Sequence, residues 1–372
     1  MRYGFFIVML TVFSALIAYA ILRGFQVLRD LPTLRTAYLV TTIVMYVFLI
    51  VGTIIGMVST APIAKYVAFI GHTALIIFIY LIISFLLTDI VRVVNYFVHF
   101  APEGMPVFRK WAFACSTAII AIVMIVGNYK FNHPKIVEMD LSVNGKATQN
   151  KELRIVAASD VHLGTSINKK RLQKYVNMIN EQKPDIVLLA GDVFDNSLAP
   201  VVKQNMYEDL RRINAPKGVY AVPGNHEYIG GDISAAMDYL KKGGITALRD
   251  SGILVDNDFY IVGRDDRSNP NRKSVAALTS NIDNSKPIIM LDHQPYHLEE
   301  AEASGIDLQI SGHTHDGQFF PVNLIVRGMY ENPHGYSSRG NTHYYISSGL
   351  GIWGPQYRIG TQSELVIINL KY

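Results

Sequence analysis

The first 130 residues differ from the rest of the chain in the length of their apolar runs. Four segments are almost uninterrupted apolar sequence, and each approaches the roughly 20 residues that a helix needs to cross a bilayer. These segments are approximately Tyr3–Leu22, Ala37–Met57, Tyr66–Leu87 and Trp111–Gly127. Backbone groups inside lipid must pair within their own segment, so the pattern predicts four transmembrane helices.

After Gly127 polar residues return and the apolar runs shorten to strand length. We therefore predict a membrane domain over residues 1–130 and a second domain over residues 131–372. The second domain is long enough to bury a sizeable core. Residues Ile136–Val143 alternate between apolar and polar, and the Asn144-Gly145 pair that follows is typical of a tight hairpin turn.

Five short apolar runs in the second domain indicate buried strands, and each ends in a cluster of polar residues. The runs are Leu153–Ala158, Asp185–Ala190, Gly218–Val222, Ile288–Leu291 and Asp307–Ile310. Stretches with helical spacing lie between several of them, at Lys169–Gln182, Tyr207–Ile213 and Ile233–Lys242. This alternation predicts an α/β domain, in which polar residues at the carboxyl ends of strands gather in one crevice.

Charge and cysteine content narrow the classes of function. The formal net charge of +4 is small and the basic residues are dispersed, so a nucleic acid partner is not expected. The single cysteine, Cys115, lies in an apolar run. A disulfide framework within one chain and a cysteine-based metal or nucleophilic site are therefore excluded.

Basic residues in the short loops predict the orientation of an integral, multi-pass membrane protein. Six of them lie between the first and second or the third and fourth spans: Arg23, Arg29, Arg35, Arg92, Arg109 and Lys110. Four lie on the opposite side: Arg2, Lys65, Lys130 and Lys135. The excess favours a cytoplasmic position for the first set, which places both termini and the second domain outside the cytoplasm. Because no Asp, Glu, Lys or Arg lies near the middle of a span, we expect an anchor rather than a transporter.

The polar clusters that end the five strands carry carboxylate, amide and imidazole groups. They read Asp160-x-His162, Gly191-Asp192-x-x-Asp195, Gly224-Asn225-His226-Glu227, His293-x-Pro295 and Gly312-His313-x-His315. Each cluster alone is a weak signal, but these ligand types together suit Mn, Fe or Zn rather than calcium. The absence of thiolates argues against a structural zinc site. A shared carboxylate could hold two divalent ions close enough to activate one water against a phosphoryl group.

In this order the five motifs resemble those of the calcineurin-like metallophosphoesterases. The resemblance covers about residues 150–372 and is nearest to a bacterial branch with a membrane or secretion element ahead of the catalytic domain. The segment Tyr345–Gly351 is also similar to the final segment of that branch. The resemblance implies an αββα sandwich, two sheets flanked by helices. It also implies hydrolysis of a phosphate monoester, diester or pyrophosphate by a hydroxide bound to two divalent metal ions.

The resemblance further assigns roles to single residues. One metal ion would be held by Asp160, His162, Asp192 and His315. Asp192 would bridge to a second ion held by Asn225, His293 and His313. His226 would stay outside the metal shell, contact the phosphate and protonate the leaving oxygen, while Asp195 would orient His226.

For several residues near these motifs, the sequence allows more than one role. Asp316 stands where the branch commonly has glycine, and its carboxylate could tune substrate choice or face solvent. Gly263–Asp266 looks like a loop that approaches the active site, without an assigned role. Trp353 and Tyr357 could line a pocket, although packing on a sheet edge is commoner for aromatic turn residues. His297, His334 and His343 are expected to be surface residues.

Anchoring at a bilayer suggests an envelope or lipid-linked phosphoester as substrate, although small soluble phosphoesters stay possible. Two other classes of function are considered beside the enzyme. One is a catalytically inactive, metal-stabilised binding or scaffold protein. The other is a regulatory domain of a membrane channel or transporter. The first is disfavoured because every ligand position and His226 are filled, and the second because mid-span charges are lacking.

Overall fold

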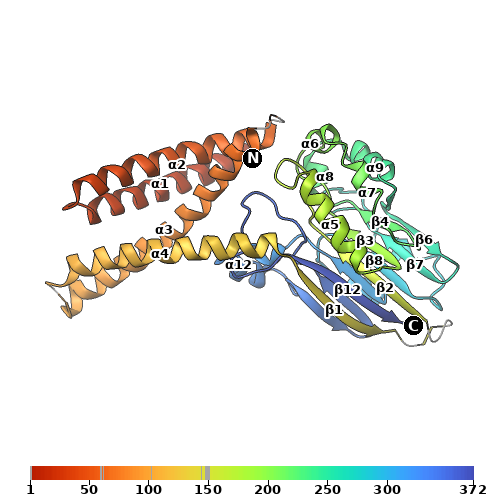
Figure 1. Cartoon of the computed structure of the whole chain (residues 1–372). Coiled ribbons are helices and arrows are strands. Elements are labelled where there is room, and N and C mark those ends of the chain that lie inside the picture. Colours follow the sequence, from red (N-terminus) through yellow and green to blue (C-terminus); the bar gives the residue numbers. More distant parts are fainter. Residues whose placement is uncertain (1, 59–60, 62, 102, 144, 147–150) are drawn as a thin grey trace. The chain divides into compact units, whose positions relative to one another are not determined.

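The computed structural model of the chain describes residues 2–58, 61, 63–101, 103–143, 145–146 and 151–372 (Figure 1). The chain divides into two compact units, Met1–Val126 and Gly127–Tyr372. Each unit is built around its own elements and is described separately.

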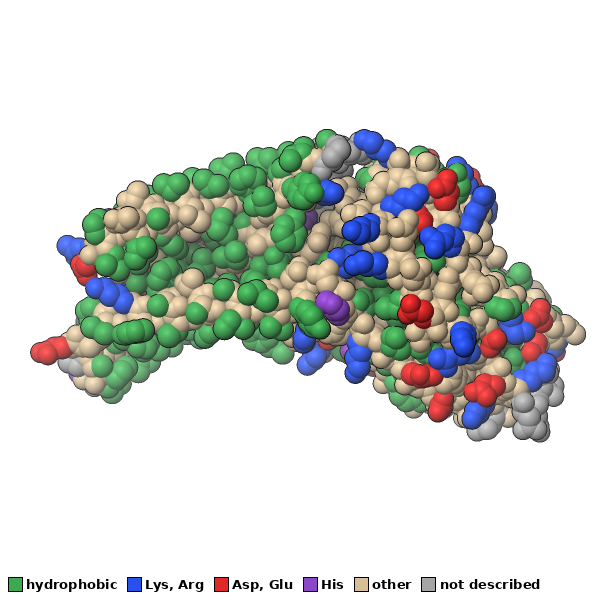
Figure 2. All heavy atoms as spheres, in the orientation of Figure 1, with side chains coloured by type: hydrophobic (Ala, Val, Ile, Leu, Met, Phe, Trp, Pro, Cys, Tyr) green, Lys and Arg blue, Asp and Glu red, His purple; other side chains and the backbone are tan. Residues whose placement is uncertain are grey.

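The first unit contains the four predicted helices. They are α1 (Arg2–Val27), α2 (Pro32–Val58), α3 (Ala64–Val98) and α4 (Met105–Asn132), and the last turns of α4, from Gly127 on, belong to the second unit. All four are long and apolar enough to cross a membrane, and apolar side chains cover their visible face in Figure 2. Gly52 and Gly71 let α2 and α3 approach closely, since a Cβ at Gly52 would lie 2.6 Å from the carbonyl oxygen of Val67. Close backbone contact through small residues is typical of helix pairs in membranes.

The second unit contains two six-stranded sheets. The first sheet has the order β1 (Lys135–Ser142), β12 (Glu364–Lys371), β2 (Glu152–Ala158), β3 (Ile186–Ala190), β4 (Val219–Val222) and β5 (Thr246–Ala247). The second has the order β10 (Gly335–Arg339), β11 (Thr342–Ile346), β9 (Leu308–Ser311), β8 (Ile288–Leu291), β7 (Phe259–Gly263) and β6 (Ser251–Val255). The remaining helices are α5 (Lys169–Glu181), α6 (Ala199–Lys203), α7 (Tyr207–Leu210), α8 (Asn225–Ile229), α9 (Ile233–Lys242), α10 (Val275–Thr279), α11 (Leu298–Ala303) and α12 (Val322–Met329).

Three apolar layers explain why the sheets stack. Alternate residues of β2 and β3, such as Ile155 and Leu188, face the second sheet and pack against Ile289 of β8. Their neighbours face outward and pack under α5, while α10 and α11 cover the outer face of the second sheet. Helix α5 buries Leu172, Tyr175, Val176 and Ile179, the residues that recur at helical spacing in the sequence. The predicted αββα sandwich is therefore confirmed.

The predicted hairpin after Ile136–Val143 is wrong. Strand β1 pairs in parallel with β12, and β12 pairs antiparallel with β2, so the C-terminal strand lies between β1 and β2. Asn144 itself lies outside the described residues. The partner of β1 comes from the far end of the chain, which a local turn signal cannot reveal.

The direction of the strands brings the motifs together. Strands β2, β3 and β4 run parallel to one another, as do β7, β8 and β9. Parallel strands end at the same edge of a sheet, and functional loops collect there. The loops after β2, β3, β4, β8 and β9 carry the five motifs.

Candidate metal centre

The candidate ligands lie in tight loops directly after the strands. Five of them have a left-handed backbone, with φ of 52° at Asp160, 52° at His162, 50° at Asp192, 70° at His313 and 51° at His315. Non-glycine residues rarely adopt this conformation, and it persists where the surrounding structure enforces it, often at functional sites. The loops therefore hold these side chains in position at a cost in backbone energy.

Two motif glycines allow the loops to meet. Gly191 has a φ of +87°, and a Cβ there would lie 2.5 Å from Nδ1 of His293. A Cβ at Gly224 would collide with the carboxylate of Asp192. Any larger residue at either position would push candidate ligands apart.

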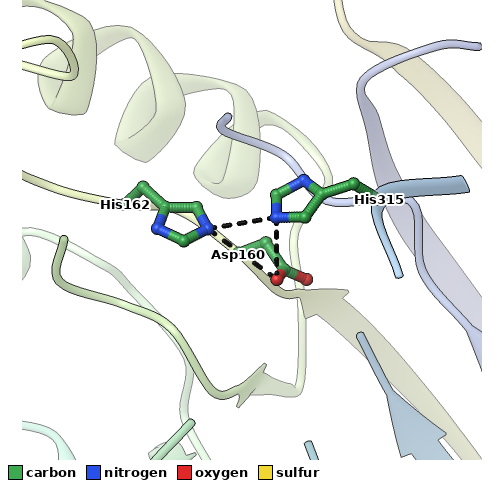
Figure 3. Close-up of side chains that lie close together, drawn as sticks. All are labelled: Asp160, His162 and His315. Atoms are coloured by element: carbon green, nitrogen blue, oxygen red, sulfur yellow. Dashed lines mark hydrogen bonds and ion pairs between the residues drawn. The ribbon is translucent and has the colours of Figure 1, made fainter. Parts of the chain in front are cut away.

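The first group of candidate ligands is Asp160, His162 and His315 (Figure 3). Nε2 of His315 lies 3.1 Å from Nε2 of His162 and 3.2 Å from Oδ1 of Asp160. Burial lowers the pKa of His162 to about 3, so this imidazole stays neutral at physiological pH. Two ring nitrogens and one carboxylate oxygen thus point at a common centre.

The second group is Asp192, His293 and His313, with Asn225 beside it. Nδ1 of His293 donates to the carbonyl oxygen of Ala190 at 2.8 Å, while Nε2 lies 3.2 Å from Oδ2 of Asp192. Nδ1 of His313 lies 2.8 Å from Oδ1 of Asn225, and burial lowers the pKa of His313 to about 4. The carbonyl behind His293 fixes the ring so that Nε2 faces the group, as is usual for metal-binding histidines.

Asp192 lies between the two groups. Its Oδ2 is 3.2 Å from Nε2 of His293 and 3.9 Å from Nε2 of His162. Burial alone would raise the pKa of Asp192, but the charge and hydrogen bond of His293 and the charge of His162 lower it overall. This carboxylate is in position to be shared by both groups.

The donor set fits a pair of divalent cations. Asp160 and Asp192 are both buried, and within the described residues their ion-pair partners are histidines rather than Lys or Arg. Nε2 of His162 and Nε2 of His315 lie 3.1 Å apart, and they lie 3.8 and 3.2 Å from Oδ1 of Asp160. Buried carboxylates are costly unless a charged partner binds them, and a divalent cation between these atoms would be such a partner.

A third cluster joins His226 and Asp195. Nδ1 of His226 lies 3.2 Å from Oδ1 of Asp195, and the rings of His226 and His162 meet edge to face at 4.5 Å. Burial lowers the pKa of His226, but the hydrogen bond and charge of Asp195, with the charge of Asp192, raise it overall. Hence His226 favours the protonated form that can donate a proton.

A cavity of about 310 Å³ opens beside these groups. Its polar end is formed by Asp192, Asn225, His226, His313 and His315. Its apolar wall is formed by Phe319, Val322, Val326 and Trp353. The ring of Trp353 lies 6.5 Å from that of His226, so Trp353 lines the pocket, whereas Tyr357 is buried.

Two supporting residues had no role assigned from the sequence. The buried carboxylate of Glu227 accepts hydrogen bonds from the backbone N–H groups of Asp192, Phe194 and Gly224 at 3.2, 2.8 and 2.7 Å. Burial and the charge of Asp192 raise the pKa of Glu227 to about 8. Glu227 follows the candidate ligand motif, which was the available signal, but its partners are backbone groups that a sequence does not show.

Arg358 is fully buried and donates to the carbonyl oxygens of His315, Ser348 and Gly351 at 2.9, 2.6 and 2.8 Å. Burial lowers its pKa to about 10, so it stays charged. Arg358 therefore ties the C-terminal loop to the His315 loop. It lies in a glycine-rich stretch without any pattern that marks it.

The structure also shows the surroundings of the residues whose roles the sequence left undecided. Asp316 is buried, with its carboxylate 3.5 Å from Nε of Arg327 and 4.0 Å from Nδ1 of His334, so the solvent-facing interpretation is wrong. His334 lies at the surface, as expected, and its Nε2 lies 3.2 Å from the carboxylate of Glu364. The Gly263–Asp266 loop packs beside the His293 loop, where Gln294 donates to Asp266 at 2.8 Å.

Comparison with known proteins gives consistent results. A family model described as calcineurin-like phosphoesterase matches residues 153–317. An uncharacterized metallophosphoesterase of Campylobacter jejuni is 32% identical over 271 residues, 70% of either chain. One from Aquifex aeolicus is 33% identical over 61% of this chain and 88% of its own. A transmembrane protein with metallophosphoesterase domain from Danio rerio is 31% identical over 68% of this chain and 61% of its own.

Proposed function

Because this chain belongs to the calcineurin-like metallophosphoesterases, we propose that it hydrolyses a phosphate monoester, diester or pyrophosphate with two divalent metal ions. The family supports a metal-dependent phosphoester hydrolase as the general activity. The number of ions, the ligand set and the substrate are the parts that we propose.

One ion would be held by Asp160, His162, Asp192 and His315, and a second by Asp192, Asn225, His293 and His313. Oxygen and imidazole donors of this kind suit Mn, Fe or Zn. Two such ions would supply a nucleophile at neutral pH and would offset negative charge on the phosphoryl group. The neutral imidazoles of His162 and His313 are ready to bind a cation. Burial lowers the pKa of His293, but the charge and hydrogen bond of Asp192 raise it overall, so a cation bound there would displace the proton of this ring.

The protein's own proton donor would be His226. It lines the cavity, and the carboxylate of Asp195 at Nδ1 favours its charged form and orients the ring. A protonated imidazole in this position can give its proton to the leaving oxygen. Asp195 would act as a positioning residue, because its contact is with His226 and not with the substrate.

The observation that carries the proposal is the pair of buried carboxylates, Asp160 and Asp192, which face Nε2 atoms of His162, His293 and His315. Purified full-length protein in detergent, loaded with Mn²⁺, should hydrolyse p-nitrophenyl phosphate or bis-p-nitrophenyl phosphate. Chelation should abolish the activity, and Mn²⁺ should restore it. No hydrolysis of either ester, nor of inorganic pyrophosphate, at a bound Mn²⁺ content of two per chain would overturn the proposal. An inactive scaffold protein predicts that result.

Four long apolar helices and relatives named as transmembrane proteins indicate membrane association. We propose further that all four helices cross the bilayer and that the second unit faces the outside of the cytoplasm. An envelope or lipid-linked phosphoester would then be the substrate within reach. A regulator of a channel or transporter is the alternative, and activity that depends on a transported ion would favour it.

A further inference from the structure

Helix α12 is amphipathic in the reverse sense for a helix on a globular domain. Its residue Asn323 is only 6% exposed, whereas Leu324, Ile325 and Met329 are 56%, 60% and 62% exposed. A surface helix normally turns its apolar stripe to the core and its polar side to water. The apolar side of α12 therefore faces whatever medium surrounds the protein at this point.

Two aromatic residues extend this apolar face. Phe320 precedes the helix. Trp353 lies in a later loop, and its carbonyl oxygen accepts a hydrogen bond from the side chain of Gln318 at 3.1 Å. Both are exposed. Phe320, Leu324, Ile325, Met329 and Trp353 are called the α12 surface below. A contiguous exposed apolar group of this kind marks a binding or membrane-contact surface, unlike scattered single residues.

The α12 surface is continuous with the candidate active site. Val322 and Val326, on the flank of α12 next to its exposed side, line the cavity together with Trp353. The opposite end of the same cavity holds Asp192, His226 and His313. One short helix thus forms the wall of the catalytic pocket with one flank and an exposed apolar face with the other.

The same side of the second unit receives the chain from the fourth predicted span. The backbone N–H of Phe320 donates to the carbonyl oxygen of Ile359 at 2.8 Å. The next residue back, Arg358, donates its N–H to the carbonyl oxygen of Gly127 in α4 at 2.9 Å. Segment 356–359 therefore connects the α12 surface with the last turns of the helix that leaves the bilayer.

The last turns of α4 have the residue types of a membrane–water boundary. Tyr129 is exposed and stacks on His133 with ring centroids 4.1 Å apart, and Lys130 lies between them in sequence. Tyrosine and basic residues are enriched where a span meets the lipid headgroups. The α12 surface is hydrogen-bonded, through two residues, to this boundary.

We propose that α12 lies in the surface of the bilayer, with its apolar face among the lipids, and that the active site takes an amphiphilic phosphoester directly from the membrane. The apolar part of the substrate follows α12 while its phosphate enters the polar end of the cavity. A short interfacial helix with an apolar face and a basic residue, here Arg327, is the usual form of such a contact. This inference rests on the proposed phosphoesterase activity, and it names the class of substrate.

The position of α12 can be tested with a fluorescent probe on the full-length protein in phosphatidylcholine vesicles. In a Cys115→Ser background, Leu324→Cys or Ile325→Cys would carry an environment-sensitive dye. Ile253→Cys, an exposed apolar residue on β6, is the matched control. Lipids brominated near the top of the acyl chain should quench the dye at Leu324 or Ile325 and leave the dye at Ile253 unchanged.

Equal quenching at the three positions, or none at α12, would overturn the proposal. Shielding of the dye that depends on protein concentration and not on brominated lipid would also overturn it, since a second copy would then cover α12.

Substrate delivery can be tested with two esters that share one leaving group. Bis-p-nitrophenyl phosphate is soluble, and a p-nitrophenyl ester of a diacylglycerol phosphate can be dispersed in phosphatidylcholine vesicles. Leu324 and Ile325 do not line the cavity, so the double substitution to Ser should leave turnover of the soluble ester unchanged. Turnover of the lipid ester should fall by about tenfold or more, because two exposed apolar side chains lose their lipid contact.

The results with the two esters show whether the phosphoesterase proposal fails or only the proposal for α12. If wild-type protein hydrolyses neither ester, the phosphoesterase proposal fails. If it hydrolyses the soluble ester but the double substitution changes both rates equally, or neither rate, the α12 inference fails alone. An Ile253→Ser control should leave both rates unchanged.

Discussion

Nδ1 of His226 lies 3.2 Å from Oδ1 of Asp195, and the same carboxylate oxygen lies 4.0 Å from Nδ1 of His162. Asp195 thus lies next to both His226, the proposed proton donor, and His162, a proposed metal ligand. A change at Asp195 should act on the ionisation of His226 without removing any donor from the metal groups.

Replacement of the proposed proton donor should have an effect that depends on the leaving group. His226→Asn should lower kcat for an alkyl phosphodiester by roughly 10²–10³-fold, since an alkoxide leaves poorly without a proton. The loss should be far smaller with p-nitrophenyl esters, whose leaving group is stable as an anion. Equal losses on both substrates would show that His226 does not donate the proton.

Asp195→Asn should give a milder version of the same pattern. It keeps the shape of the side chain but removes the charge that raises the pKa of His226. The basic limb of the pH–rate profile should therefore shift to lower pH, while the bound metal content stays unchanged. A merely structural role for Asp195 would lower the rate at all pH values without this shift.

Replacement of the shared carboxylate should remove metal as well as activity. Asp192→Asn should lower bound Mn²⁺ below two ions per chain and lower turnover at least 10³-fold, because both groups lose a charged donor. Metal analysis of the purified protein measures the first effect. Asp209→Asn, a buried carboxylate beside Lys169, is the control and should keep full metal content.

The ion pair of His334, near the surface, with the buried Glu364 predicts a pH dependence of stability. Burial lowers the pKa of His334, but the hydrogen bond and charge of Glu364 raise it overall above 6.5. Burial raises the pKa of Glu364, but His334 lowers it overall below 4.5. The contribution of His334 is full below pH 6.5 and is lost as pH rises through its folded-state pKa. The contribution of Glu364 is full above pH 4.5 and is lost as pH falls through its folded-state pKa.

The pair should therefore stabilise most between pH 4.5 and 6.5. In His334→Gln the decline of Tm between pH 6.5 and 8 should become shallower than in wild type. Thermal unfolding in detergent across this range measures it. His297→Gln, at an exposed position, should retain the wild-type slope, and an unchanged slope in His334→Gln would contradict the prediction.

Arg358→Met should destabilise the second unit although it replaces none of the proposed ligands. Three buried carbonyl groups would lose their donor, and each unsatisfied buried group costs about 1–3 kcal/mol, so a loss of roughly 3 kcal/mol or more is expected. The His315 loop should loosen as well, which should weaken Mn²⁺ binding in a titration. Arg339→Met removes an exposed arginine whose partners Glu302 and Glu331 are also exposed, and it should leave Tm nearly unchanged.

The location of most candidate ligands was predictable because it follows from strand direction. Asp160 and Asp192 each come directly after a buried apolar run, and the parallel strands β2 and β3 end at one edge of their sheet. His293 and His313 likewise follow the parallel strands β8 and β9 of the second sheet. Helix α5 was equally predictable, since its buried residues are its periodic ones. In these elements the local pattern and the final packing agree.

Other features were not predictable, because they depend on contacts between distant parts of the chain or on a helix that exposes its apolar side. Strand β12 enters between β1 and β2 from the far end of the chain, against a hairpin signal. Helix α12 buries Asn323 and exposes Ile325, so its amphipathic pattern indicates the opposite orientation. Arg358 binds backbone carbonyls, and a sequence does not show which carbonyl groups will lie within its reach.

The left-handed backbone at Asp160, His162, Asp192, His313 and His315 has a consequence for inactive relatives and engineered forms. Glycine or asparagine accepts this conformation more easily than aspartate or histidine, and neither adds to the crowding of buried charge. Metal-free variants that lose these side chains should therefore melt at higher temperature than the metal-free parent. Selection for turnover, and not for folding alone, is then what keeps all five side chains in place.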